Sequence, residues 1–208
     1  GCDAVKFQKR TIDIVYAPEV LAQPRESAWG TTQREQKEGL EFGKVEYDQI
    51  DAYCRQLGIE WFASAWDIPS QEFLRQYQCR YNKIASAMAT HVGFLEVVAS
   101  EGKPTFLSTG MCTYDDIDRA VGMLKKGNCP LVIMHTVATY PAVESDLNLS
   151  VINALRDRYK LPVGYSGHES SGSPSAMAAM MGAVAIERHI TLDRAMYGSD
   201  QAASLELP

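Results

Sequence analysis

Short apolar runs that end in polar residues recur along the chain and predict its strands. From residue 60 onward, these runs alternate with segments of helical periodicity about every 20 to 30 residues, which is typical of repeated βα units around a parallel sheet. Each strand is expected to have a buried interior, including Ala4 to Phe7 in the first. The seven expected strands cover residues 1–8, 60–64, 81–86, 104–110, 131–135, 162–165 and 184–189.

Helices are expected between these strands, over residues 45–57, 70–77, 93–100, 113–126, 148–159 and 173–182. Gly58 is placed to end the first of them, and Thr113, with Asp116 three residues later, is placed to cap the fourth. The segment 9–44 is charged and rich in Gly and Pro, and it is too long for an ordinary connection. We therefore expect it to form an excursion that faces the substrate.

The predicted fold class is α/β, specifically a (β/α)8 barrel of the TIM type that is partial and lacks its first strand. An eight-fold barrel usually takes about 250 residues, whereas this chain has 208 and its alternation begins on a strand. Residues 1–208 are expected to form one partial catalytic barrel domain. A doubly wound sheet is the structural alternative, although the glycine-rich fingerprints of nucleotide-binding folds are absent from the sequence.

The composition, with 46% apolar and 22% charged residues, is that of a globular protein. No apolar run reaches the roughly 18 residues of a membrane span, and no signal peptide is recognisable, so we expect a cytoplasmic protein without a membrane partner. The formal charge of -6 disfavours nucleic acid as a partner. The five cysteines are odd in number and widely spaced, which indicates reduced thiols.

Polar residues stand at the carboxyl ends of all seven expected strands. In a barrel these ends form the one rim that carries active sites. The residues are Lys6 and Gln8, Ser64, Lys83 and Ser86, Ser108 and Thr109, His135 and Thr136, Ser166 and His168, and Glu187 and His189. The lysines, with the hydroxyls of Ser86, Ser108 and Ser166, suit a phosphate group. The alternative is that each lysine simply extends from a strand end into water.

His168 and His189 lie at the ends of consecutive strands and suit a divalent ion such as manganese, cobalt or zinc, with Glu187 near enough to orient an imidazole. Two ligands of one ion should bring their ring nitrogens to within about 3 to 4 Å. The alternative is a pair of structural histidines. His135 and His91 are not expected to be ligands. Cys112 has no obvious base beside it, so we expect a buried thiol without a catalytic role.

Seven short motifs follow one another along the chain. They are VKFQ at 5–8, NKIAS at 82–86, LSTGM at 107–111, TYP at 139–141, GYSGHE at 164–169, ERHITLD at 187–193 and GSD at 198–200. Together, nearly from end to end and in order, they resemble the motifs of the sialic acid synthase family. The versions at 164–169 and 187–193 are most similar to the branch that includes animal sialic acid phosphate synthases.

The resemblance implies condensation of phosphoenolpyruvate with N-acetylmannosamine or its 6-phosphate, giving sialic acid or its 9-phosphate and phosphate. It implies a divalent metal, with Mn²⁺ expected and Mg²⁺, Co²⁺ or Zn²⁺ as alternatives. It also implies a homodimer of the full-length protein, an earlier strand carrying further site residues, and a C-terminal antifreeze-like domain absent from 1–208. A fragment of this kind should close its barrel poorly and have low activity alone.

The residue roles implied by the resemblance agree with the pattern of strand ends. His168 and His189 would hold the metal. Lys6, Lys83 and Glu187 are the catalytic candidates, with Ser86, Ser108 and Ser166 completing the phosphoenolpyruvate site, and Gln8, Tyr140 and Asp200 would face the sugar.

Three residues depart from the pattern of the family: Met88 where an acidic residue is common, Ala138 and Gln201. Because Met88 replaces the acidic residue, the resemblance does not identify the group that transfers protons. These departures leave two alternatives, namely a related synthase that condenses phosphoenolpyruvate with another aldose, and a non-catalytic barrel that binds sugar phosphates. The choice between free sugar and 6-phosphate, the N-acyl group and the metal also stay open.

Overall fold

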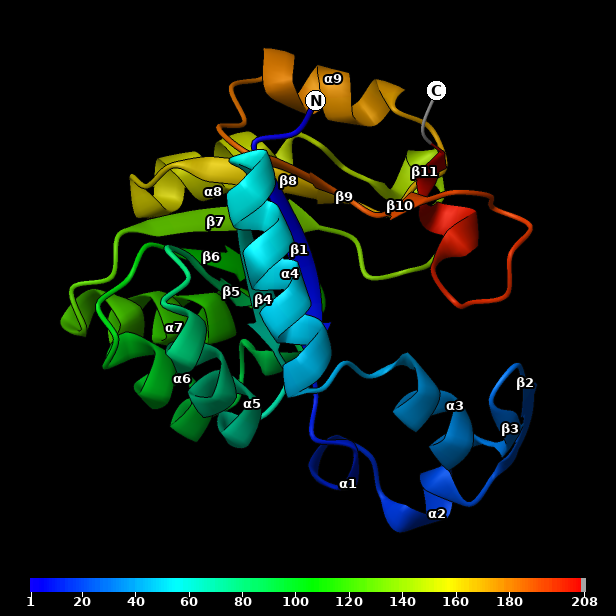
Figure 1. The fold of residues 1–208 in the computed structure, drawn as a ribbon. Coiled ribbons are helices and arrows are strands. Elements are labelled where there is room, and N and C mark those ends of the chain that lie inside the picture. The colour runs from blue at the N-terminus through cyan, green and yellow to red at the C-terminus, as the bar shows by residue number, and fades with distance from the viewer. Residues whose placement is uncertain (207–208) are drawn as a thin grey trace.

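The computed structural model describes residues 1–206 and contains a seven-stranded parallel sheet in which strands adjacent in the chain are neighbours in space. The sheet curls into part of a barrel with helices outside it (Figure 1), which confirms the predicted fold class. A doubly wound sheet is wrong because the strand order never reverses. The strands are β1 (Ala4–Lys9), β4 (Glu60–Ala65), β5 (Asn82–Ile84), β6 (Thr105–Ser108), β7 (Leu131–Thr136), β8 (Val163–Gly167) and β9 (Ile186–Arg188).

Six helices follow the strands as predicted, with small shifts at their ends. They are α4 (Lys44–Leu57), α5 (Ile68–Leu74), α6 (Val92–Ala99), α7 (Tyr114–Lys126), α8 (Val151–Tyr159) and α9 (Ser173–Met180). Gly58 ends α4 in the left-handed conformation at φ 65°, and Thr113 and Asp116 form the expected capping box of α7. Helix α5 begins earlier than predicted because the Asp67 side chain caps it by accepting from the Ser70 amide at 2.7 Å.

Three short 3-10 helices account for segments that were predicted as parts of longer elements or as loops. η1 (Arg75–Tyr77) extends α5, η2 (Ser86–Met88) begins where the predicted strand 81–86 was expected to end, and η3 (Glu144–Asp146) precedes α8. The strands predicted over 81–86 and 104–110 are therefore shorter than expected.

The excursion between β1 and α4 has secondary structure of its own. It contains α1 (Ile12–Val15), α2 (Pro18–Leu21), the antiparallel pair β2 (Pro24–Ser27) and β3 (Gly30–Thr32), and α3 (Gln33–Leu40). It lies beyond the carboxyl end of β1, at the lower right of Figure 1. After β9 the chain forms β10 (Ile190–Thr191), η4 (Gln201–Ala203) and β11 (Leu205–Glu206) beyond the carboxyl end of that strand.

The core lies between the sheet and its helices, where Tyr47, Phe94, Leu107, Ile133 and Tyr165 are completely buried. None of the helices in residues 1–206 combines the length and the apolar character that a membrane crossing requires.

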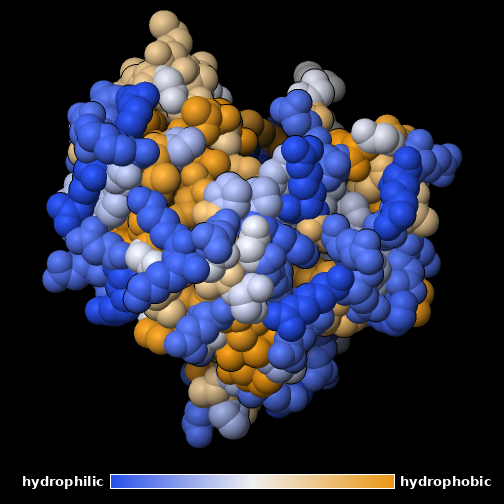
Figure 2. All heavy atoms as spheres, turned by 90° about the vertical axis from the view of Figure 1, so that its left-hand side faces the viewer, coloured by the Kyte–Doolittle hydropathy of each residue, from blue (hydrophilic) through white to orange (hydrophobic). Residues whose placement is uncertain are grey.

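The two edge strands are less buried than predicted. Residues 4–7 of β1 are only half-buried, and in the last predicted strand Val184 and Ile186 are 62% and 41% exposed. The prediction of buried interiors is wrong for both because, within residues 1–206, β1 pairs only with β4, and β9 only with β8. Met180, the last residue of α9, is also exposed. In Figure 2, apolar residues lie in the recess at the top of the molecule, the end at which α9 lies in Figure 1.

Candidate active site

The carboxyl ends of the strands bring the predicted charged residues together inside the curled sheet. Glu187 of β9 lies 3.5 Å from Lys6 Nζ of β1 through Oε1, and 3.8 Å from Lys83 Nζ of β5 through Oε2. Since β1 and β9 are the two edges of the sheet, the ion pair between Lys6 and Glu187 spans its opening. Residues from opposite ends of the chain therefore form one charged cluster with two lysines and one carboxylate.

Burial and mutual charge set the protonation of this cluster. Lys83 is 3% exposed, and burial, aided by Lys6 and opposed by Glu187, lowers its pKa to about 8. Burial raises the pKa of Glu187, but Lys83, Lys6 and His189 outweigh that effect and bring it to about 2. The carboxylate is thus ionised at neutral pH, so the cluster carries a net positive charge when both lysines are protonated.

Two of the three predicted serines contact the cluster, and the third does not. Lys83 Nζ donates to Ser108 Oγ at 2.5 Å, and Ser166 Oγ donates to Glu187 Oε1 at 3.3 Å. Ser86 Oγ instead accepts from the Gly110 amide at 2.9 Å. A Cβ at Gly110 would lie 3.0 Å from that hydroxyl, so a glycine allows the two segments to approach closely.

His168 is held in one tautomer by the segment that follows β7. Its Nδ1 lies 2.6 Å from the Val137 carbonyl oxygen, an acceptor, so Nδ1 carries the proton and donates it. Nε2 then has a free lone pair and accepts from the Tyr140 hydroxyl at 2.8 Å. The Tyr140 ring stacks on the imidazole with centroids 4.0 Å apart. Thr136 Oγ1, from a residue predicted at the rim without a specific role, lies 3.4 Å from Nδ1.

His189 faces His168, with ring centroids 5.4 Å apart and planes inclined at 61°. Two imidazoles that share an ion through bonds of about 2 Å place their centroids about 5 Å apart. Burial lowers the pKa of both histidines, that of His189 to about 4, so both rings are neutral at pH 7. The two rings are thus close neighbours, and their role as ligands of one divalent ion stays a prediction. Residues 1–206 contain no group of three or more His, Cys, Asp or Glu arranged to hold a metal.

Two of the three residues expected to face a sugar lie beside the histidines. Asp200 Oδ2 is 3.6 Å from His189 Nδ1. Burial, with the charges of Asp200 and Glu187, raises the pKa of Tyr140 to about 12, so its hydroxyl stays protonated and can donate. Gln8, at the end of β1, accepts through Oε1 from the Arg10 guanidinium. Tyr140 and Asp200 are thus brought to the histidine pair, while Gln8 lies on the β1 side.

A buried ion pair behind the site was missed by sequence reasoning. Glu169, fully buried, lies 3.0 Å from Arg188 Nη1 and accepts from the Tyr165 hydroxyl at 2.8 Å. The Arg188 guanidinium also donates to the carbonyl of Ser171 at 2.8 Å. A signal was present, because Arg188 stands between Glu187 and His189, and alternation along a strand points its side chain to the opposite face.

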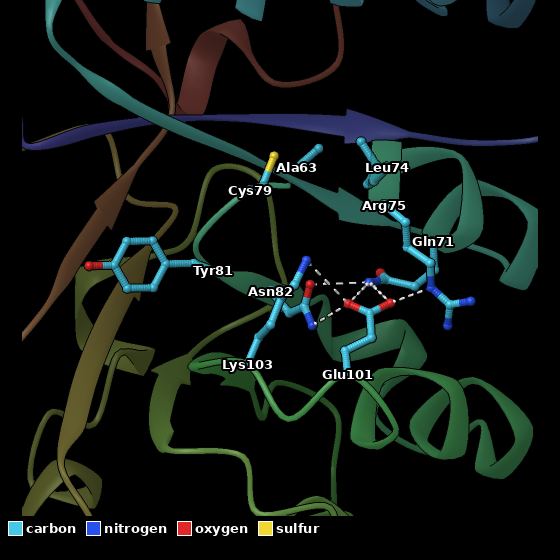
Figure 3. Close-up of a pocket in the computed structure, with 9 residues that line it drawn as sticks. All are labelled: Ala63, Gln71, Leu74, Arg75, Cys79, Tyr81, Asn82, Glu101 and Lys103. Atoms are coloured by element: carbon cyan, nitrogen blue, oxygen red, sulfur yellow. Dashed lines mark hydrogen bonds and ion pairs between the residues drawn. The ribbon is translucent and has the colours of Figure 1, made fainter. Parts of the chain in front are cut away.

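A second polar cluster lies at the amino ends of β5 and β6, away from the rim. Figure 3 shows the Glu101 carboxylate between Gln71, Arg75, Asn82 and Lys103. The Arg75 Nε donates to it at 2.9 Å and the Asn82 amide at 3.0 Å. The cavity there is lined by these residues and is almost completely filled by their side chains.

Comparisons with known proteins agree with the βα-barrel fold of the chain. A profile of the NeuB family matches residues 1–208, and the chain belongs to this family. It is 38% identical to an N-acetylneuraminate-9-phosphate synthase of Drosophila melanogaster, over 99% of this chain and 56% of that protein. It is 34% identical to an N,N'-diacetyllegionaminic acid synthase of Legionella pneumophila, over 99% of this chain and 60% of that protein.

Among solved structures, two examples have the same fold as this chain. The N-acetylneuraminic acid synthetase of Leptospira borgpetersenii, crystallised with citrate, aligns with a TM-score of 0.87 and 30% identity, over 98% of this chain and 68% of that chain. A truncated 3-deoxy-D-arabino-heptulosonate 7-phosphate synthase of Thermotoga maritima aligns with a TM-score of 0.65 and 18% identity, over 80% of this chain and 67% of that one, which shows the fold alone. The chain spans a little more than half the length of the curated relatives that it matches.

Proposed function

We propose that the full-length protein condenses phosphoenolpyruvate with an N-acylhexosamine and releases phosphate, as a cytoplasmic homodimer. The sugar would be N-acetylmannosamine or its 6-phosphate, and the product sialic acid or its 9-phosphate. The observation that carries the proposal is the contact of Lys6 and Lys83 with Glu187, two residues from His189. The family and the three 9-phosphate synthases among its relatives support the same reaction.

The lysine cluster suits phosphoenolpyruvate because this substrate carries a carboxylate and a phosphate. Lys6 and Lys83 would neutralise these anions, and the hydroxyls of Ser108 and Ser166 would donate to their oxygens. Glu187 keeps the two ammonium groups close to each other when no anion is present. Neither contact of Glu187 with a lysine is as short as a direct hydrogen bond, so an entering anion can compete for both lysines.

We assign His168 and His189 as ligands of a divalent metal, with Mn²⁺ as the expected ion. When bound, such an ion supplies Lewis acidity that polarises a carbonyl oxygen. The residues of this chain prepare the site, since the Val137 carbonyl fixes the His168 tautomer and Asp200 lies beside His189. Gln8, Tyr140 and Asp200 would hold the sugar hydroxyls so that its aldehyde carbon meets C3, the methylene carbon of phosphoenolpyruvate. Water would then add at C2, and the bond between C2 and the phosphate oxygen would break to release phosphate.

We do not assign proton transfer to the residue at position 88. Met88 is buried in the hydrophobic core. Lys83, whose pKa is lowered to about 8, is the group of this cluster best matched to proton transfer near neutral pH.

The proposal is tested by incubating the full-length protein with phosphoenolpyruvate, Mn²⁺ and either N-acetylmannosamine or its 6-phosphate, and by measuring phosphate release. We expect turnover with at least one sugar and none after chelation of the metal. Absence of turnover with both sugars, in protein shown by thermal melting to be folded, contradicts the proposal.

A second candidate is synthesis of another nonulosonic acid from another aldose. It is favoured by relatives that are N,N'-diacetyllegionaminic acid and pseudaminic acid synthases, at 34% and 31% identity. A panel of N-acylated and diacetamido hexoses compared by kcat/KM decides between the two products.

A further inference from the structure

Tyr140 contacts both histidines of the candidate metal pair. It stands in the segment that follows β7, and its ring stacks on the ring of His168 with centroids 4.0 Å apart. The same ring lies 5.7 Å from the ring of His189, with the two planes at 89°. Because the two histidine rings are themselves 5.4 Å apart, each of the three rings is a neighbour of the other two. Tyr140 is therefore placed to act on the histidine pair as well as on a sugar.

The hydroxyl of Tyr140 uses the lone pair of His168 that a metal ion would need. Nδ1 of His168 lies 2.6 Å from the Val137 carbonyl oxygen, which can only accept, so Nδ1 carries the ring proton. The lone pair of the neutral ring is then on Nε2, which accepts from the Tyr140 hydroxyl at 2.8 Å. A histidine ligand binds a metal through this same lone pair. The hydrogen bond and a bond from Nε2 to a metal therefore exclude each other.

Of the two side chains that form this hydrogen bond, Tyr140 is the one that can move. His168 is only 6% exposed, and its ring is held on the other side by the Val137 carbonyl. Tyr140 is 45% exposed, so its side chain can turn toward solvent without opening the core. The hydroxyl can therefore leave Nε2 while His168 keeps the tautomer and the position that a metal ligand requires.

We propose that the Tyr140 hydroxyl competes with a divalent ion for Nε2 of His168, and that it turns to the sugar when the ion binds. This inference rests on the proposed function, in which His168 and His189 hold the metal and Tyr140 faces the sugar. While the hydrogen bond is formed, Nε2 is not available to the ion and the hydroxyl is not available to the sugar.

Such competition makes the binding of metal and sugar cooperative. Both bind better to the form in which Tyr140 has left His168, so the binding of either one raises the fraction of that form. Linkage requires that the sugar strengthens Mn²⁺ binding by the same factor by which Mn²⁺ strengthens sugar binding. For a hydrogen bond of ordinary net strength, this factor is about 3- to 10-fold. Tyr140 therefore favours the complex in which the ion and the sugar are both bound.

The test compares the affinity of the full-length protein for Mn²⁺, without substrates, with that of the variant Tyr140→Phe. Phenylalanine keeps the ring that stacks on His168 and removes only the hydroxyl. We expect the variant to bind Mn²⁺ about 3- to 10-fold more tightly in calorimetric titration, because the competitor for Nε2 is gone. A tyrosine oxygen that itself bonds the ion predicts the opposite sign. Unchanged or weaker Mn²⁺ binding in the folded variant overturns the competition.

Tyr197→Phe is the matched control. It also removes one tyrosine hydroxyl, but this hydroxyl accepts from Arg25 Nε at 3.1 Å and not from a group of the histidine pair. We expect Tyr197→Phe to keep the wild-type affinity for Mn²⁺. If both variants bind Mn²⁺ more tightly by the same factor, the effect does not come from Nε2 and the competition is overturned. Melting temperatures show whether each variant is folded.

A second titration measures the cooperativity directly. Mn²⁺ affinity is determined with and without the sugar that supports turnover, in the absence of phosphoenolpyruvate, so that no bond is formed. We expect the sugar to strengthen Mn²⁺ binding to the wild-type protein, and we expect Tyr140→Phe to lose about 3- to 10-fold of this effect. Cooperativity that remains in the variant comes from contact between the sugar and the ion. Equal cooperativity in both proteins contradicts the role of Tyr140.

The outcomes separate the competition from the reaction. Turnover by the wild-type protein, with equal Mn²⁺ affinity in Tyr140→Phe, overturns the competition and leaves the condensation in place. Tighter Mn²⁺ binding by the variant without turnover of any sugar by the wild-type protein supports the competition and overturns the condensation. Absence of Mn²⁺ binding in both proteins overturns the metal assignment and the competition together.

Discussion

Two buried carboxylates lie at opposite ends of the same sheet, and they are held in different ways. Glu101, at the amino ends of β5 and β6, accepts hydrogen bonds at 2.9 to 3.2 Å from Arg75, Asn82 and Gln71 (Figure 3). Glu187, at the rim, contacts its two lysines at 3.5 and 3.8 Å. The first is fully engaged by its neighbours, whereas the second keeps two cations near each other through longer contacts.

The difference agrees with a general property of βα barrels. Clusters at the amino ends of the strands stabilise the fold, and clusters at the carboxyl ends serve chemistry. The same residue types can therefore have opposite consequences when they are replaced. Changes at the rim should alter activity more than stability, and changes around Glu101 should alter stability more than activity.

The largest expected effect at the rim is that of the histidine pair. His168→Ala or His189→Ala in the full-length protein should lower kcat by at least about 1,000-fold and abolish the dependence on added Mn²⁺. Metal affinity is measured by titration with Mn²⁺, and turnover by phosphate release. His135→Gln is the control, because His135 Nε2 bonds the Leu147 carbonyl at 2.7 Å and belongs to no metal pair. Equal metal affinity in all three variants would refute the assignment.

Lys83→Met should be the next most harmful change to activity. Loss of one buried cation from the lysine cluster should reduce kcat/KM for phosphoenolpyruvate by about 100-fold or more. The free energy of unfolding should change by no more than about 1 kcal/mol, because methionine removes the desolvation cost of a buried ammonium group. A large loss of stability together with an activity near that of the wild type would contradict the proposed difference between the two ends of the sheet.

The ion pair of Glu169 and Arg188 sharpens the comparison, since it is buried but lies directly behind the site. Glu169→Gln should weaken Mn²⁺ binding by about 10- to 100-fold, because the pair fixes the segment after β8 that carries His168. Glu169 acts through His168 and touches no substrate, so KM for phosphoenolpyruvate should change little. If Glu169→Gln lowered the stability but left the affinity for Mn²⁺ unchanged, the ion pair would have only a structural role.

Glu101→Gln should have the smallest effect on activity and a clear effect on stability. Burial raises the pKa of Glu101, but hydrogen bonds from Arg75, Asn82 and Gln71 outweigh that effect, so the net pKa lies below its ordinary value of 4.5. A carboxylate with a depressed folded pKa contributes stability above the unfolded pKa and loses it as the pH falls through the folded pKa. The glutamine variant should lose about 1 to 3 kcal/mol at pH 7.

That loss should shrink as the pH falls below 4.5, since protonation removes the same charge from the wild-type protein. Urea unfolding of the full-length protein across this range provides the measurement, and Glu96→Gln, on the nearby helix α6, is the matched control. A loss that is independent of pH would show that the charge of Glu101 is not what stabilises this end of the sheet.

The sequence predicted the parts of the fold and site that depend on local pattern. Strands with polar carboxyl ends identified Lys6, Lys83, Glu187 and both histidines, because the ends of parallel strands must share one edge of the sheet. Thr113 and Gly58 marked helix ends for equally local reasons, namely side-chain capping and a left-handed φ.

Local sequence patterns did not predict the features that depend on residues far apart in the chain. The exposure of Val184 and Ile186 follows from the absence of a second neighbour for β9 among the described residues, which no local run of residues reveals. The elements of the excursion are only three to eight residues long, too short for a clear hydrophobic period. Ser86 was assigned to the phosphate site from its hydroxyl at the end of a predicted strand, and in the structure this hydroxyl accepts from the Gly110 amide.

The charged residues of strand β9 also help to determine which face of the strand points into the barrel. Its apolar residue Ile186 is largely exposed, so burial does little to decide which way the strand faces. A slip by one residue would turn Arg188 toward Lys6 and Lys83 and would set Glu187 against the buried Glu169, two repulsive encounters at once. The residues that prepare the site for its substrates therefore also exclude the mispaired strand, and neutralising them should make this edge of the sheet conformationally heterogeneous.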